Sequence, residues 1–366
     1  MALRTPPRCR GLSASLVLLI VAGTASVARP AEVPQATVPA TRPAFDQPLG
    51  IGLEAFAYPH PVRFLPLTID GQDVRMAYMD VPPAGRQPGA PAPATTNPAP
   101  DVVVLLHGKN FGGAYWADTI AALTAAGHRV VVPDQVGFGK SGKPDVAYSF
   151  DLLAANTAAL LDHLRVERAA VVGHSMGGML AVRFARTHPR RVTRLVLENP
   201  IGLEDWRAKG VPPRTTEDVY QSELKQSGDA VRAYFKTAYF AHTEWRPEWD
   251  RLVEPAARVA LSGEFPRWAQ ASALTYQMIY QQPVRHEFPL VAVPTLLVIG
   301  QADRTALGRA FAPEAARAAL GDYPRLGREA AKDIPNARLV ELEGVGHIPH
   351  VEAAERFHDA LLPYLR

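Results

Sequence analysis

Short, nearly continuous apolar runs alternate with segments of helical spacing through most of the chain. The apolar runs lie at residues 101–106, 129–133, 169–172, 194–197, 295–299 and 338–342, and the helical segments at about 114–126, 151–165, 176–187 and 351–364. A continuous apolar run is typical of a strand that is buried on both faces of a parallel sheet. Alternation of such strands with helices predicts an α/β fold with a doubly wound, mostly parallel sheet.

The alternation stops between residues 201 and 293, where no strand-like run occurs. This stretch shows helical spacing, and it contains four of the five tryptophans of the chain. A structureless connection of this length is uncommon inside a compact domain. We therefore expect residues 201–293 to form a helical sub-domain.

The amino terminus carries the features of an export signal. Three arginines precede an apolar run at residues 12–25, and small residues follow it up to Ala28. A basic start, a short apolar core and small residues at the end predict a secretory signal peptide that is cleaved near Ala28. The alternative is an uncleaved anchor, but the run is shorter than the ~20 residues that span a bilayer. We expect an exported product, periplasmic or secreted, without a stable membrane anchor.

The segment between the signal and the first buried run is irregular. Residues 29–55 have scattered prolines and no periodic pattern, which predicts a poorly ordered arm. Two strand-like runs, 63–69 and 74–81, are joined by Asp70-Gly71, a pair typical of a hairpin. Residues 82–100 contain seven prolines and predict an exposed loop. The expected division is a signal peptide (1–28), an arm (29–55), a first core part (56–200), the helical segment (201–293) and a second core part (294–366).

Charge and cysteine content narrow the possible functions. The formal net charge of +3 depends on the three arginines of the signal segment, so the mature chain is close to neutral. This balance does not indicate a surface for nucleic acid. The single cysteine, Cys9, also lies in the signal segment. The mature chain therefore has no thiol for a disulfide, a thiolate nucleophile or a metal ligand.

The sequence Gly173-His174-Ser175-Met176-Gly177-Gly178 lies between an apolar run and a helical segment. Small residues on both sides of a serine allow the sharp turn from strand to helix that exposes a nucleophile. The alternative is a glycine-rich turn with an incidental serine. The position between strand and helix favours Ser175 as a nucleophile.

A serine nucleophile needs a neighbouring base, and the base needs an orienting partner. His347 follows the run at 338–342, and Asp303 follows the run at 295–299. Because the carboxyl ends of parallel strands face one crevice, Ser175, His347 and Asp303 are predicted to meet there. Glu198, at the end of another run, is the rival acid. His347 and His350 could form a metal pair, but no third ligand is evident and we expect no metal.

The turn His107-Gly108-Lys109-Asn110 also follows a predicted strand. Backbone N–H groups at such a turn, with that of the residue after the nucleophile, can stabilise an oxyanion. This reasoning nominates the N–H groups of Lys109 and Met176.

Candidates for the substrate pocket are one residue of this turn and three aromatic residues of the helical segment. These are Asn110, Trp245, Trp268 and Tyr276. Pockets for small molecules are mostly apolar with a few polar groups. Aromatic walls with few cations nearby predict a small, uncharged and partly apolar substrate.

Together these motifs resemble those of the α/β-hydrolase family, in the capped branch that includes esterases, carbon–carbon bond hydrolases and cofactor-free haloperoxidases. The resemblance covers about residues 61–366 and rests on His107-Gly108, residues 134–141, the Ser175 motif, Asp303 and Gly346-His347. It implies a helical cap after the sixth core strand, a Ser175–His347–Asp303 triad and no cofactor. Epoxide hydrolases and haloalkane dehalogenases of this branch usually carry an aspartate where this chain has Ser175.

The reaction that the resemblance favours is hydrolysis of a small-molecule ester, as in a carboxylesterase. Two alternatives use the same triad, namely carbon–carbon bond hydrolysis and perhydrolysis. A third is a ligand receptor that keeps the fold without turnover. The fold alone does not choose among them.

Overall fold

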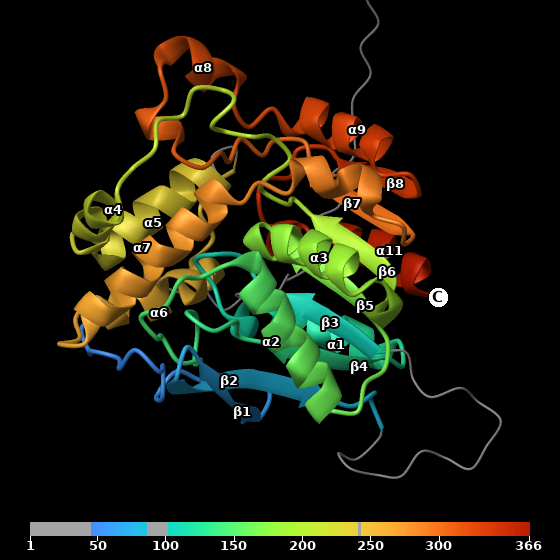
Figure 1. Cartoon of the computed structure of the whole chain (residues 1–366), viewed down its shortest axis with the longest axis horizontal. Helices are drawn as coiled ribbons and strands as arrows, with labels where there is room; N and C mark the ends of the chain where they lie inside the picture. Colours follow the sequence, from blue (N-terminus) through green and yellow to red (C-terminus); the bar gives the residue numbers. More distant parts are fainter. Residues whose placement is uncertain (1–44, 86–101, 241–242) are drawn as a thin grey trace, which may run out of the picture. The chain divides into compact units, whose positions relative to one another are not determined.

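The computed structural model describes residues 45–85, 102–240 and 243–366 (Figure 1). The expected signal peptide, the first part of the arm and most of the proline-rich loop lie outside these residues. Within the described part, eight strands form one sheet in the order β1-β2-β4-β3-β5-β6-β7-β8. The strands are β1 (Val62–Ile69), β2 (Gln72–Val81), β3 (Val102–Leu106), β4 (Arg129–Pro133), β5 (Ala169–His174), β6 (Val192–Glu198), β7 (Thr295–Gly300) and β8 (Ala337–Leu342).

The pairing of the strands confirms the predicted sheet. Strands β1 and β2 are antiparallel and are joined by Asp70 and Gly71, whose φ angles of 48° and 75° are both left-handed. Strand β2 runs antiparallel to β4, and all the remaining pairs are parallel. Every residue of β5 and β7 is buried, as expected for continuous apolar runs.

Helices cover both faces of the sheet. Alternate residues of β3 belong to different apolar clusters, Val104 to one and Val103 to the other, because side chains along a strand point to opposite faces. Residues of α2 (Phe150–His163), α3 (Met176–Thr187) and α9 (Tyr323–Asp333) join the first cluster, and residues of α1 (Ala117–Ala125), α10 (Pro349–Glu352) and α11 (Ala354–Leu365) the second. Figure 1 shows α2 and α3 side by side over the sheet.

A helical insertion separates β6, the sixth strand along the chain, from β7. We call residues 199–294 the insertion. It contains α4 (Thr216–Glu223), α5 (Gly228–Tyr234), the π-helical turn η3 (Phe235–Tyr239), the short turn η4 (Pro247–Trp249), α6 (Asp250–Val259), α7 (Phe265–Gln281) and the turn η5 (Arg285–Leu290). No strand occurs in its described residues, as predicted for residues 201–293.

The structure adds elements that the pattern did not indicate. These are α8 (Glu314–Ala319), α9 and the short turns η2 (Pro189–Arg191) and η6 (Arg309–Phe311), whereas the turn η1 (Gly113–Trp116) falls largely within the predicted segment 114–126. Helix α9 follows Asp322, whose side chain caps it, and it buries one stripe at helical spacing. The stripe combines the large Tyr323 and Leu326 with the small Gly327 and Ala330. None of the described helices is both long enough and apolar enough to cross a membrane.

The expectation of a poorly ordered arm is wrong for residues 45–55. Leu49 and Leu53 are buried in a small apolar cluster with Val259 and Phe265 of the insertion. The Leu49 N–H also donates to the carbonyl of Arg258 at 3.0 Å. Two leucines four residues apart bury enough apolar surface to fix this part of the arm despite its prolines.

Candidate active site

Ser175 occupies a strained turn between β5 and α3. Its φ and ψ angles of 56° and −120° are rare for a residue with a side chain, and its side chain is only 5% exposed. The turn is held by hydrogen bonds from the Ser175 N–H to the Glu198 carbonyl at 3.1 Å and from the Gly178 N–H to the Ser175 carbonyl at 2.9 Å. Such strain persists only where surrounding structure over-determines it, which is typical of functional sites.

The glycines on either side of Ser175 are required by close backbone packing. A Cβ atom on Gly173 would collide with the backbone of Gly177. One on Gly177 would collide with the carbonyl of Leu106 in β3. The Gly-x-Ser-x-Gly spacing therefore allows the strand, the turn and the following helix to pack at contact distance.

The structure brings together Ser175, His347 and Asp303, which lie after β5, β8 and β7. His347 Nε2 lies 3.0 Å from Ser175 Oγ, and His347 Nδ1 lies 2.7 Å from Asp303 Oδ2. All three side chains are buried. The carboxylate therefore accepts the Nδ1–H proton and leaves the Nε2 lone pair facing the serine hydroxyl.

Asp303 has two further hydrogen-bond donors. Asn199 Nδ2 donates to Asp303 Oδ2, and the Thr305 N–H donates to Asp303 Oδ1, each at 2.7 Å. Burial alone would raise the pKa of the Asp303 carboxyl, but His347 and these donors outweigh it and lower that pKa below its usual value. The sequence analysis missed Asn199, although its position directly after β6 was a usable signal.

Glu198, the rival acid, has a different partner. Its carboxylate accepts from the His350 N–H at 2.7 Å and lies 2.9 Å from His350 Nδ1. Burial raises the pKa of Glu198 to about 7. His347 and His350 therefore form hydrogen bonds with different carboxylates, His347 with Asp303 and His350 with Glu198. Among the described residues, no group of three or more potential ligands could hold a metal ion.

A second buried series of hydrogen bonds connects the loops around Ser175. The Gly108 N–H donates to the Tyr115 hydroxyl at 2.9 Å, and this hydroxyl lies 2.9 Å from His174 Nδ1. His174 Nε2 lies 2.8 Å from the His347 carbonyl, which can only accept. The Tyr115 hydroxyl therefore donates to His174, and this series of hydrogen bonds links the turn after β3 to the His347 loop. Sequence reasoning gave no role to Tyr115 or His174.

These buried groups lead to a prediction on stability. Burial lowers the pKa values of His107, His174 and His350, so the unfolded chain binds protons below pH 6.5 that the native chain does not. We expect the free energy of unfolding to fall between pH 6.5 and 5, each histidine contributing up to about 1.4 kcal/mol per pH unit. Glu198 opposes this fall, because its raised pKa lets the native state keep a proton that the unfolded state has released.

Urea denaturation from pH 5 to 8 checks this prediction. The variant Glu198→Gln lacks the carboxyl that binds this extra proton in the native state. Its free energy of unfolding should therefore fall more steeply with decreasing pH below pH 6.5, by about 1.4 kcal/mol per pH unit, the effect of one proton. It should also be more stable than the wild type above pH 7, where the wild type carries a buried carboxylate. Identical slopes for the two proteins would contradict the assignment of the proton to Glu198.

The geometry near Ser175 suits an oxyanion. Met176 is the first residue of α3, so its N–H has no acceptor within the helix. Gly108 packs against Ser175, since a Cβ atom there would lie 3.1 Å from Ser175 Cβ. The next residue, Lys109, turns its side chain to the insertion, where Nζ donates to Ser272 Oγ at 2.7 Å.

A cavity of about 920 Å³ lies between the turn after β3, the insertion and the loop after β7. Asn110, Trp268 and Tyr276 line it, as expected. Trp245 does not belong to this lining. Its indole N–H donates to Asp250 Oδ1 at 3.0 Å, and its ring packs inside the insertion against two other aromatic rings.

Tyr239 is a further residue near His347 that the sequence did not indicate. Its ring stacks on the imidazole with centroids 4.6 Å apart, and its hydroxyl accepts from Asn110 Nδ2 at 2.7 Å. The His347 N–H donates to the Tyr239 carbonyl at 3.2 Å. The insertion thus contacts the candidate base directly and fixes it from one side.

The expectation of few cations near the pocket is wrong. Six basic residues line the cavity, against a single acidic one among the described lining, Glu223. The basic residues are Lys109, Arg214, Lys225, Arg304, Arg309 and Arg317. Half of them follow β7, far along the chain from the aromatic segment that suggested an apolar pocket.

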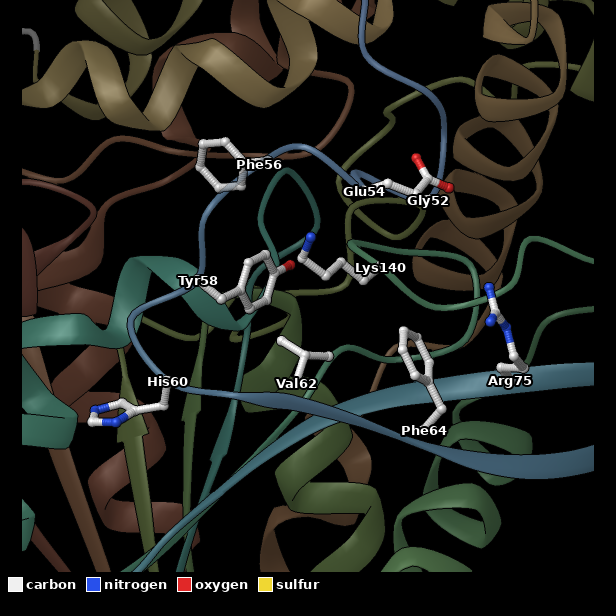
Figure 2. A pocket seen from close by; sticks show the side chains of 9 residues that line it. All are labelled: Gly52, Glu54, Phe56, Tyr58, His60, Val62, Phe64, Arg75 and Lys140. Carbon is white, nitrogen blue, oxygen red and sulfur yellow. The ribbon is translucent and has the colours of Figure 1, made fainter.

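A second, shallower pocket of about 420 Å³ lies beside the arm (Figure 2). Figure 2 shows Lys140 next to Tyr58, and its Nζ lies 4.8 Å from the centroid of the Tyr58 ring. The Tyr58 hydroxyl donates to Asp134 Oδ2 at 2.6 Å, and the Lys140 N–H donates to the same oxygen at 2.7 Å. These contacts make residues 134–141 a structural turn. Neither this pocket nor the large cavity includes Ser175, His347 or Asp303 in its described lining.

Comparison with known proteins identifies the family. A model described as the alpha/beta hydrolase fold matches residues 101–354. The chain belongs to the α/β-hydrolase family. A probable hydrolytic enzyme from Pseudomonas aeruginosa PAO1, known as a crystal structure, is 48% identical with a TM-score of 0.83, over 88% of this chain and 100% of that one. This α/β hydrolase therefore shares both fold and much of its sequence with a solved protein.

Two relatives with named activities are more distant. A 2-hydroxy-6-oxo-2,4-heptadienoate hydrolase of Pseudomonas putida is 32% identical over 55% of this chain and 72% of the relative. A 2-hydroxy-6-oxononadienedioate/2-hydroxy-6-oxononatrienedioate hydrolase of Burkholderia vietnamiensis is 27% identical over 83% of this chain and 95% of the relative. The chain is a hydrolase of the α/β fold.

Proposed function

We propose that this α/β hydrolase cleaves an ester bond of a small molecule through an acyl-enzyme on Ser175. The observation that carries the proposal is the hydrogen-bonded series from Ser175 Oγ through His347 to Asp303. A serine hydroxyl is a weak nucleophile near neutral pH unless a base accepts its proton. This arrangement supplies the base and orients it, and Thr305, whose N–H donates to Asp303, lines the cavity of about 920 Å³.

The reaction follows from the positions of the groups. His347 Nε2 accepts the Ser175 hydroxyl proton while Oγ attacks the ester carbonyl carbon. The N–H groups of Lys109 and Met176 stabilise the resulting oxyanion. The protonated imidazole then donates its proton to the leaving alcohol, and water, activated by the same nitrogen, releases the acid. Asp303 keeps the Nδ1–H proton in place and stabilises the imidazolium.

A fluorophosphonate probe tests whether Ser175 is activated. The purified mature protein should gain the mass of one probe, because only a serine with a functioning base reacts rapidly with it. The variant Ser175→Ala is the control and should remain unlabelled. A wild-type protein that stays unlabelled would contradict the proposal and favour a receptor without turnover.

Carbon–carbon bond hydrolysis is the second candidate, since two relatives are named as hydrolases of 2-hydroxy-6-oxo dienoic or related acids. Turnover of p-nitrophenyl esters and of a vinylogous 1,5-diketone should be compared on the same preparation. The proposal of an esterase requires that kcat/KM be higher for the esters.

The two indoles of the insertion predict different effects on acyl-chain preference. Trp268 lines the cavity, so Trp268→Ala should shift the optimal ester towards longer acyl chains. Each buried methylene is worth about 0.8 kcal/mol, or about fourfold in kcat/KM. Trp245→Ala is the matched control and should lower Tm without moving the optimum. A series of p-nitrophenyl esters from acetate to decanoate measures both, and equal losses on all esters in Trp268→Ala would contradict a lining role.

We also propose that the protein is exported after cleavage near Ala28, on the strength of the amino-terminal sequence. Intact-mass analysis of protein recovered from the periplasm or the medium tests this. A full-length chain in the inner membrane would contradict it.

A further inference from the structure

Four arginines of the large cavity form no close ion pair with a carboxylate in the described part of the chain, although hydrogen bonds from Thr215 and, to a smaller extent, the nearby Arg214 lower the pKa of the Asp218 carboxyl. Each guanidinium donates only to carbonyl or hydroxyl oxygens. Arg214 donates to the Asp218 carbonyl and Ser222 Oγ, Arg304 to the carbonyls of Gln301 and Asp303, Arg309 to the Arg304 carbonyl, and Arg317 to the Ala312 carbonyl. These bonds leave several N–H donors of each group free, because a guanidinium has five.

Several arginines outside the cavity form ion pairs with carboxylates. Arg183, Arg129 and Arg232, for example, form ion pairs with carboxylates at 2.6 to 2.8 Å. In the cavity, the single acidic lining residue, Glu223, lies 3.7 Å from Lys109. A hollow that carries several positive charges and one negative charge raises the local concentration of anions.

The arginines that line the cavity come from two segments that contact each other, one in the insertion and one after β7. Arg214 precedes α4 of the insertion, and its guanidinium lies 4.3 Å from the ring of Phe311, in the segment after β7. Arg309 belongs to η6 in that same segment. The contact joins the two elements and orients Arg214, and both Arg214 and Arg309 are half-buried.

Ser175, His347 and Asp303 are not in the described lining of the cavity, but residues that contact Asp303 or the partners of His347 are. Asn110, which lines it, bonds to the tyrosine that stacks on His347. Thr305, also in the lining, donates its N–H to Asp303. Apolar side chains, among them Trp268, complete the wall. Lys109, whose N–H group is a proposed oxyanion donor, also lines the cavity, so a ligand that the arginines hold can extend towards Ser175.

We propose that these arginines bind an oxyanion, a carboxylate or a phosphate, at the end of the substrate remote from the scissile ester. Guanidinium groups match such oxygens in geometry and bind them by charge-assisted hydrogen bonds. The inference rests on the proposed esterase function and specifies its substrate as an anionic ester with a partly apolar middle. It replaces the uncharged substrate expected from the sequence.

Two esters that differ only in charge test the inference. These are mono-p-nitrophenyl suberate and its methyl ester. The wild type should favour the anionic ester by at least about tenfold in kcat/KM, a preference that rising KCl should reduce. Arg309→Gln and Arg214→Gln should each lose about tenfold on the anionic ester while the neutral ester changes less than twofold. The control Arg190→Gln, at an exposed arginine of η2 outside the cavity lining, should change neither.

Equal kcat/KM for the two esters in the wild type, with no selective loss in the arginine variants, would overturn the inference and leave the esterase proposal standing. If neither ester is cleaved, the esterase proposal fails. The inference of an oxyanion site is then tested by ligand binding, measured as a shift in Tm. Suberate or inorganic phosphate should then raise the Tm of the wild type more than dimethyl suberate does, and Arg309→Gln should abolish the difference. The absence of this difference in Tm would overturn the inference. The more effective of the two anions identifies the oxyanion as carboxylate or phosphate.

Discussion

Replacing Ser175 with alanine is expected to lower kcat on a p-nitrophenyl ester by up to about 10⁶-fold, because nucleophile and base act as a unit. The only atom removed is Oγ, which lies 3.0 Å from His347 Nε2. Alanine keeps the Cβ atom at the strained φ of 56°, so the backbone and the surrounding packing should stay as they are. Steady-state kinetics on the purified variant, with Tm as a check on folding, measures the loss.

The corresponding change at the base provides a sharper control. His347→Ala should cost nearly as much as Ser175→Ala, and the double variant should cost hardly more than either single one, since each change already disables the unit. Additive losses would show that the two residues act independently. A Ser175→Ala protein with more than about 1% of wild-type kcat would contradict the acyl-enzyme mechanism, because such a rate exceeds what binding and the oxyanion donors alone retain.

Local sequence predicted the strands and the strand-to-helix turn at Ser175 well, because both depend on neighbours along the chain. Continuous apolar runs gave β5 and β7, and the glycines around Ser175 are explained by contacts with the next helix and the adjacent strand. Chain order and the rule that strand ends share a crevice were enough to place Asp303 and His347 beside Ser175. The pairing of Glu198 with His350 depends on the packing of α10 and could not be read from spacing.

The charge of the cavity was missed for a related reason. Aromatic residues of the insertion are visible as a local enrichment, whereas the arginines approach from the segment after β7, where the chain shows little apolar periodicity. Only the fold brings Arg309 and Arg214 into the lining of one cavity. The arm was misjudged because its two buried leucines find their partners about 200 residues away, in the insertion.

Asp303→Asn is expected to lower kcat by about 10⁴-fold, through the tautomer of His347 rather than through its position. Asp303 Oδ2 accepts from both His347 and Asn199, and Oδ1 accepts from the Thr305 N–H. An asparagine can keep the Thr305 bond only by turning its amide N–H₂ towards His347. The imidazole must then accept at Nδ1 and carry its proton on Nε2, where it can no longer take the proton of Ser175.

The matched change at the other buried carboxylate separates this mechanism from a general effect of lost charge. Glu198→Gln keeps an oxygen for the His350 N–H, and Glu198 makes no hydrogen bond to His347 in the described structure, so kcat should fall less than about tenfold. Proton NMR of the downfield imidazole N–H adds a readout that packing damage would not produce. The Nδ1–H signal of His347 should vanish in Asp303→Asn and persist in Glu198→Gln. A mild effect of Asp303→Asn together with a severe one of Glu198→Gln would assign the orienting acid to Glu198, and the hydrogen bond of 2.7 Å between Asp303 and His347 would then be structural.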